Sequence, residues 1–306
     1  MIYFLVTAPH RYTIDKLLAA RPGQLPVEIV PVTYPELVGG AYGGPGTFIF
    51  TDLERLTPEE MEWLARMWNA LERSGRPVRL MNHPLLAMRR YELLRELYER
   101  RINDFNVYHL TEGRRPQRYP VFVRAADDHR GGLTPLLHTP AELDAAVETL
   151  VAAGKCRDTR IVVEFCGGVD DRGYYRKYGA FFVNGTVIPR RLLFSTDWIV
   201  KGTKVELDDD LLAKEYEYLT TNPHEELIRR VFQIARIDFG RVDYGLIDGR
   251  VRIYEINTDP SMYGGSERRH EKHFPDLPHV ADKLMASIAA LDPPSAGTDG
   301  AALASA

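Results

Sequence analysis

Three oxygen-bearing side chains are predicted to lie together near the end of the chain. Residues 241–247 have the alternating pattern of a β-strand, an Asp-Gly-Arg turn follows, and residues 251–256 form the returning strand. In such a hairpin Asp243 lies near Glu255, and Asn257 follows on the same face as Glu255. Two carboxylates and an amide oxygen suit Mg²⁺ that carries the phosphates of a nucleotide. The alternative is an ordinary hairpin whose polar ends face water.

The elements before this hairpin indicate an α/β protein. The first 82 residues alternate strand and helix signals, which is typical of a small parallel α/β domain. Thr57 and Pro58 predict the start of one helix, because Thr caps a helix and Pro suits its first turn. The predicted strands of this region are residues 2–7, 27–31, 47–51 and 78–81. A glycine-rich loop at residues 39–46 lacks dinucleotide-binding spacing, so no Rossmann cofactor is predicted there.

Composition limits the classes of function. The net charge of −4 gives no general attraction to nucleic acid or to an anionic membrane surface, so neither is an expected partner. No apolar run approaches the roughly 20 residues that span a bilayer. Cys156 and Cys166 are too few for a disulfide framework, which favours a reduced, cytoplasmic location, and Cys166 is expected to be a structural thiol.

The hairpin resembles the C-terminal signature of the ATP-grasp superfamily. The segments Gly-Arg-Val-Asp, ending at Asp243, and Asn-Thr-Asp-Pro-Ser, starting at Asn257, resemble the D-alanine–D-alanine ligase branch in particular. The resemblance covers roughly residues 80–290. It implies an α/β (α+β) protein with an ATP-grasp fold, preceded by a Rossmann-like preATP-grasp domain.

The resemblance also implies the organisation of the chain. Residues 1–82 would be the preATP-grasp α/β domain, and residues 83–168 a linker helix with the first ATP-grasp subdomain. Residues 169–292 would form the second subdomain, and residues 293–306 a mobile tail. A helix entered through Pro84 is expected to start the linker.

The cofactors implied by the resemblance are ATP and one or two Mg²⁺ ions, for which Mn²⁺ can substitute. Asp243, Glu255 and Asn257 would hold the metal. Arg124 stands where the family has a phosphate-binding lysine, and the guanidinium suits phosphate oxygens. The remaining nucleotide contacts implied are Gly131 and Gly132 for phosphate, Glu164 for the adenine amine, the backbone of Phe165 and Cys166 for the ring, and Asp171 for the ribose, with Asp170 in reserve.

Further cations are implied in the same site. Residues 174–183 and 186–194, joined by Asn184-Gly185, are predicted to form a β-hairpin. Arg191 in its second strand and Lys201 just after it would lie near the phosphates. Arg241 matches the arginine of the ligase motif and would stabilise the transferring phosphoryl group or the tetrahedral intermediate. A second family lysine is replaced by Tyr91, where Arg89 or Arg90 could substitute or could be helix-surface charges.

The function implied is an ATP-dependent ligase. It would activate a carboxylate as an acylphosphate and join it to an amine or another nucleophile. The expected partners are a small-molecule or peptide substrate, and a homodimer is a possible assembly. Two alternatives are a nucleotide-binding protein that has lost catalysis, because both lysines are replaced, and a kinase that phosphorylates a hydroxyl group.

Overall fold

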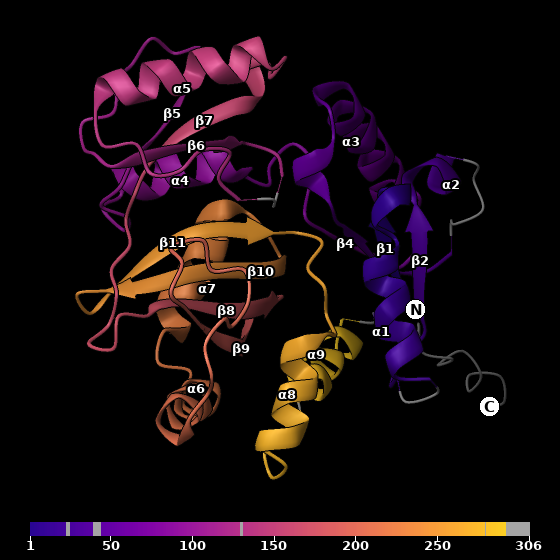
Figure 1. Ribbon diagram of the computed structural model, residues 1–306. Helices are drawn as coiled ribbons and strands as arrows, with labels where there is room; N and C mark the ends of the chain where they lie inside the picture. Colours follow the sequence, from indigo (N-terminus) through magenta and orange to yellow (C-terminus); the bar gives the residue numbers. More distant parts are fainter. Residues whose placement is uncertain (23–24, 39–43, 129–130, 279, 292–306) are drawn as a thin grey trace, which may run out of the picture.

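Three β-sheets and their helices make up the part of the chain that the structure describes (Figure 1). The structure is a computed structural model that describes residues 1–22, 25–38, 44–128, 131–278 and 280–291. Residues 293–306 and most of the glycine-rich loop lie outside the described residues. Each sheet falls inside one of the three predicted ranges. The domain boundaries themselves stay a prediction.

The N-terminal sheet is parallel, as the alternation of strands and helices predicts. Its strand order is β2-β1-β3-β4. The predicted Thr57 cap is confirmed, because Thr57 and Glu60 form a reciprocal capping box. The elements are β1 (Ile2–Val6), α1 (Tyr12–Ala20), β2 (Ile29–Thr33), α2 (Tyr34–Val38), β3 (Gly46–Phe50), α3 (Pro58–Glu72) and β4 (Val78–Met81).

The central sheet is a small antiparallel one with the order β5-β7-β6. Its elements are β5 (Val107–His109), β6 (Val121–Ala125), α5 (Pro140–Ala152) and β7 (Arg160–Glu164). Helix α4 (Arg90–Glu99) lies between this sheet and the C-terminal one in Figure 1. The predicted helix is present as α4, but the expected start at Pro84 is wrong, because residues 84–86 form a turn and Arg89 is extended (ψ 172°) before the helix begins.

The C-terminal sheet is antiparallel with the order β11-β10-β8-β9. Both predicted hairpins are confirmed, β8–β9 and β10–β11. Helix α8 was not predicted. The elements are β8 (Tyr175–Val183), β9 (Thr186–Ser195), α6 (Asp209–Thr221), α7 (Glu225–Ala235), β10 (Phe239–Ile247), β11 (Arg250–Asn257), α8 (Gly265–His273) and α9 (Val280–Ala289).

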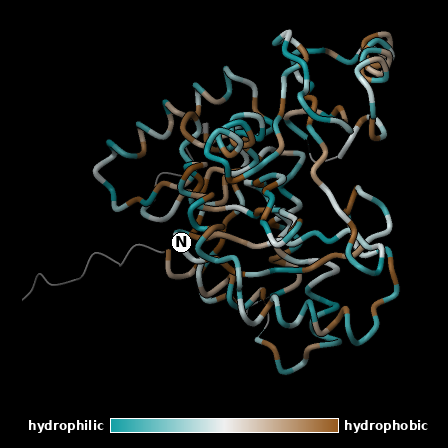
Figure 2. Tube along the Cα trace, turned by 90° about the vertical axis from the view of Figure 1, so that its left-hand side faces the viewer, coloured by the Kyte–Doolittle hydropathy of each residue, from teal (hydrophilic) through white to brown (hydrophobic). Residues whose placement is uncertain are grey.

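The N-terminal and C-terminal sheets share one hydrophobic core, whereas the central sheet has two small cores of its own. Phe4 of β1 packs edge-on against Phe239 of β10, with ring centroids 5.2 Å apart. Figure 2 shows hydrophobic stretches running through the middle of the molecule. Among the described helices, none combines the length and apolar character that crossing a bilayer requires.

Asn82 connects the N-terminal sheet to the C-terminal sheet through hydrogen bonds. Its side chain is fully buried, and its Nδ2 donates to Phe50 O (3.0 Å) and to Phe239 O (2.9 Å). Its Oδ1 accepts from the backbone N–H groups of Asp238 (2.7 Å) and Phe239 (3.0 Å). Asn82 also has a positive φ of 61°, which Asn tolerates better than most residues.

Asn82→Ala is expected to lower the free energy of unfolding by about 2–4 kcal/mol, because it leaves several buried backbone groups without partners. A urea unfolding curve measures this change. Asn184→Ala is the matched control, since Asn184 also has a positive φ (44°) but is exposed in a turn. A loss in Asn184→Ala as large as that in Asn82→Ala would show that backbone strain, and not the buried contacts, accounts for the effect.

Candidate nucleotide and metal site

Strand register brings the predicted metal ligands onto one face of the C-terminal sheet. Asp243 of β10 lies directly opposite Glu255 of β11, and Arg241 lies opposite Asn257. Residues two apart on a strand point to the same side, so all four side chains share one face. Asn257 is buried, and its Oδ1 accepts from the backbone N–H of Asp259 (2.8 Å). The hairpin therefore brings two carboxylates and an amide oxygen together as expected.

Three cations surround the Asp243 carboxylate. Arg241 Nε lies 2.8 Å from Oδ1, Lys177 Nζ 3.1 Å from Oδ2 and Arg191 Nη2 3.6 Å from Oδ2. Burial raises the pKa of Asp243, but Arg241, Lys177 and Arg191 outweigh burial and hold the pKa well below its ordinary value. Asp243 is therefore ionised at neutral pH.

A β-bulge contributes to this concentration of charge. The register of β8 and β9 shifts between Gly179 and Ala180, opposite Arg191 and Pro189, and leaves Arg190 as the extra residue. Arg190 lies over the Phe181 ring (4.9 Å) and pairs with Glu267 of α8 (2.8 Å). Burial is the main cause that lowers the pKa of Arg191, to about 9.

Two arginines from other elements hold the Glu255 carboxylate. Arg90 of α4 lies 2.6 Å from Glu255 Oε2, and Arg124 at the end of β6 lies 3.1 Å from the same atom. Burial, followed by the charge of Arg90, lowers the pKa of Arg124 to about 10. Tyr91, which stands at the position of the family lysine, points elsewhere, because its hydroxyl contacts Glu112. The neighbouring Arg90 contacts Glu255 in its place.

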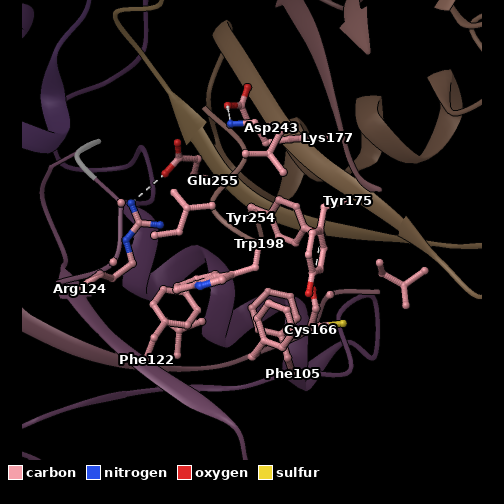
Figure 3. Close-up of a pocket in the computed structure, with 18 of the residues that line it drawn as sticks. Phe105, Phe122, Arg124, Cys166, Tyr175, Lys177, Trp198, Asp243, Tyr254 and Glu255 are labelled. Carbon is pink, nitrogen blue, oxygen red and sulfur yellow. Dashed lines mark hydrogen bonds and ion pairs between the residues drawn. The ribbon is translucent and has the colours of Figure 1, made fainter. Parts of the chain in front are cut away.

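A pocket between the central and C-terminal sheets has an aromatic end and a charged end (Figure 3). The aromatic end includes Trp198, which packs on Phe122 (ring centroids 4.9 Å apart) and on Phe165 (5.7 Å). The charged end carries Arg124, Lys177, Asp243 and Glu255. The predicted residues Phe165 and Cys166 line the aromatic end, as do Tyr175 and Tyr254, which the sequence did not single out.

The predicted glycines also line this pocket. A Cβ at Gly131, whose φ is 97°, would lie 3.1 Å from Lys201 Cε, and a Cβ at Gly132 would lie 3.1 Å from the Trp198 ring. Lys201 lines the pocket as well. Glycine at both positions therefore lets the loop backbone approach Lys201 and Trp198 closely.

Glu164 lines the pocket, but groups of the protein itself surround its carboxylate. Glu164 is buried, and its Oε1 accepts from the Tyr108 hydroxyl (2.9 Å) and from the backbone N–H groups of Gln117 (3.0 Å) and Arg118 (3.2 Å). Its Oε2 accepts from the backbone N–H of Asn106 (2.9 Å) and from the Arg118 side chain (3.5 Å). These donors occupy the carboxylate, so we assign it to bracing residues 106–118 and not to an adenine amine.

The acid predicted to hold the ribose is also displaced. Asp171 is exposed in a turn and does not line the pocket. The reserve residue, Asp170, accepts from the backbone N–H groups of Arg172 and Tyr174 and pairs with Arg176 (2.7 Å). Asp170 therefore stabilises its own turn, and neither carboxylate is positioned for a ribose.

The donor set fits Mg²⁺ that shares its ligands with a nucleotide. Among the described residues, no cluster of three or more His, Cys, Asp or Glu side chains is arranged to hold a metal. Mg²⁺ is usually bound by one or two carboxylates together with phosphate oxygens and water. Asp243 and Glu255, with the amide of Asn257, match that pattern.

Arg124→Ala is expected to weaken ATP binding by roughly 10- to 100-fold, since a hydrogen bond to a charged group contributes about 1.5–3 kcal/mol. Arg124→Lys keeps a point charge and should lose less. Isothermal titration calorimetry with MgATP measures both. Arg160→Ala, on the same sheet but outside the pocket lining, is the control. Equal affinity in all of these proteins would show that Arg124 does not contact phosphate.

Comparisons with known proteins identify the fold. No family model matches the chain, and no curated protein sequence does. Two solved structures of D-alanine–D-alanine ligase from Bacillus anthracis, one of them complexed with ATP, are similar to it, at 16% sequence identity. Each comparison covers 95% of this chain and 96% of the ligase, with TM-scores of 0.56 for the ATP complex and 0.58 for the other. The chain therefore has the ATP-grasp fold.

Proposed function

We propose that the protein is an ATP-dependent ligase that activates a carboxylate and joins it to an amine. The observation that carries this proposal is the arrangement of charge at the charged end of the pocket. Five cations, one lysine and four arginines, lie within 4 Å of the Asp243 and Glu255 carboxylates, which line that end. The excess of positive charge suits a triphosphate, and the aromatic end suits the base of a nucleotide.

In this proposal the adenine ring binds among Phe165, Trp198 and Tyr175, with the backbone beyond Glu164 at its edge. The phosphates extend toward Arg124 and Lys201. The replaced family lysines do not count against activity, since Arg90 and Arg124 supply two buried cations that both contact Glu255.

Asp243, Glu255 and Asn257 would hold Mg²⁺, which neutralises charge on the phosphate oxygens when it is bound. The present contacts of Arg90, Arg124 and Lys177 with these carboxylates would be exchanged for contacts with phosphate. Such exchange needs no new cation, because the five are already within 4 Å of the carboxylates.

The protein's contribution would be positioning and charge stabilisation. Phosphoryl transfer depends on in-line geometry and on neutralised oxygens more than on covalent catalysis. The γ-phosphoryl group would pass to an oxygen of the substrate carboxylate, and ADP would leave. Arg241 and Arg191 lie on the same face as the metal ligands, next to Asp243, and would stabilise charge on the transferring group. The substrate would be a small molecule or a peptide.

Release of ADP and of phosphate, measured separately, tests the proposal. The protein is incubated with MgATP and a panel of D- and L-amino acids and dipeptides, singly and in pairs. ADP and phosphate released together, with a condensed product in the mass spectrum, support the ligase. ADP released without phosphate, together with a phosphorylated hydroxyl compound, would indicate a kinase instead. ATP binding with no release under any condition would indicate a binding protein.

A further inference from the structure

A histidine–carboxylate pair lies at the carboxyl ends of β1 and β3. His10 Nδ1 is 2.8 Å from Asp52 Oδ2 and 2.9 Å from Thr7 Oγ1. Thr7 also donates to Asp52, and Arg55 pairs with the other oxygen of that carboxylate. The Asp52 side chain is completely buried, whereas 27% of the His10 side chain is exposed. The Asp52 carboxylate is therefore buried and held in place by its contacts, whereas part of the His10 imidazole is exposed to solvent.

The pair lies at a position where open parallel sheets commonly bind ligands. In the order β2-β1-β3-β4, the chain moves to one side of β1 and then returns to the other side, so the order reverses between β1 and β3. In open parallel α/β sheets, ligands bind outside the carboxyl ends of the strands at such a reversal. Thr7 and His10 follow β1, and Asp52 follows β3.

Direct contacts link His10 to Asn257, one of the proposed metal ligands. Thr13 Oγ1 lies 2.9 Å from His10 O and 2.8 Å from Asp259 Oδ1. The Asp259 backbone N–H donates to Asn257 Oδ1 (2.8 Å). β11, which ends in Asn257, points toward the N-terminal domain in Figure 1. These contacts connect His10, through Thr13 and Asp259, to Asn257 at the end of β11.

The pair is chemically suited to accept a proton. With the Nδ1–H of His10 directed at Asp52, Nε2 is the basic nitrogen, and the buried carboxylate stabilises the imidazolium that forms. The groups near the imidazole include Thr7 and the ring of Tyr12, whose centroid is 6.2 Å away. A base must face the nucleophile, so a base at this position requires an amine that approaches from the carboxyl ends of β1 and β3.

We propose that His10 is a catalytic residue that accepts the proton of the attacking amine, which rests on the ligase function proposed above. The amine lone pair forms the C–N bond with the acyl carbon. The C–O bond to the phosphate breaks, and phosphate leaves with that electron pair. The proton lost by the amine nitrogen moves to His10 Nε2, and Asp52 stabilises the resulting cation.

Competition between two nucleophiles tests this assignment. Hydroxylamine is largely unprotonated at neutral pH and traps acylphosphates as hydroxamates without a general base, whereas an ordinary amine is protonated and needs one. The full-length protein is assayed with MgATP, a carboxylate that stimulates ADP release, and either hydroxylamine or the amine that gives a product. The measured quantity is the ratio of the amide rate to the hydroxamate rate.

In His10→Gln this ratio should fall by on the order of 100-fold or more, which is the usual contribution of general base catalysis. Asp52→Asn should lower it in the same direction. His83→Gln is the matched control, because His83 is a half-buried histidine that packs on Trp68 of the N-terminal domain (ring centroids 4.7 Å apart). The control should keep the wild-type ratio.

The possible failures are distinguishable. An unchanged ratio in His10→Gln, or equal losses with both nucleophiles, overturns the base assignment and leaves the ligase function intact. If the wild-type protein forms neither hydroxamate nor amide with any carboxylate in the panel, the proposed ligase function fails, and the role of His10 fails with it.

Discussion

Glu255→Gln is expected to lose ADP release by at least about 100-fold. The change keeps the shape of the side chain but removes one charge from the proposed metal site. It also leaves Arg90 and Arg124, both buried, without their carboxylate. Removing even a supporting partner of a metal ligand costs 10- to 100-fold in metal affinity or activity, so a ligand itself should cost no less. The Mg²⁺ concentration needed for half-maximal ADP release should rise as well.

Glu215→Gln provides the control for this variant. Glu215 is fully buried and is paired with Arg269 (2.6 Å) and His270 (3.0 Å), as Glu255 is paired with two cations. It does not line the pocket. Glu215→Gln should therefore be destabilised without a change in the Mg²⁺ requirement. Undiminished ADP release in Glu255→Gln, or the same shift in both variants, would remove Glu255 from the metal site.

Arg241→Ala is expected to reduce ADP release by on the order of 10²–10³, with a much smaller loss of ATP affinity. Removing one donor that stabilises developing charge typically has this effect on rate. Lys177 and Arg191 remain beside Asp243 in the variant, so the carboxylate stays ionised and can still hold the metal. A protein that only binds ATP would gain little from a third cation at this position.

Turnover with the stimulating carboxylate and ATP affinity by calorimetry are measured on the same preparation. Arg241→Lys should retain part of the rate, because it keeps a positive charge but loses the two-point contact with Asp243 (2.8 and 3.3 Å). If affinity falls as far as turnover, Arg241 is a ground-state ligand, and the proposed transition-state role is wrong.

Much of the fold could be predicted because its signals are local. The capping box at Thr57, the Asn-Gly and Asp-Gly turns, and the alternation of apolar residues each depend on a few neighbouring positions. Helix α8 gave no such signal, because it begins after Gly264 without a side-chain cap. The start of α4 was misplaced, because an extended Arg89 separates the helix from the proline that was taken as its start.

The site was only partly predictable, because its charges meet through strand register and packing between elements. Asp243 and Glu255 could be paired from one hairpin. Lys177 contacts Asp243 only because β8 pairs with β10. Arg90 contacts Glu255 only because α4 packs on the hairpin. The role predicted for Glu164 shows the converse problem. Sequence order put it at the nucleotide, but residues distant along the chain occupy its carboxylate.

The separate cores of the central sheet have a consequence for the order of folding. The chain leaves the larger core after Ile102 and returns to it at Tyr174. Between these points Asp104 and Cys166, 62 positions apart, are in contact through Cys166 Sγ (3.4 Å). The central subdomain is therefore topologically an insertion. Formation of the shared core requires contact between Asn82 and Phe239, which lie 157 positions apart in the chain. If the insertion folds first, its joined ends shorten that loop and reduce the entropy lost on closing it. Early folding of the insertion would thus speed assembly of the shared core.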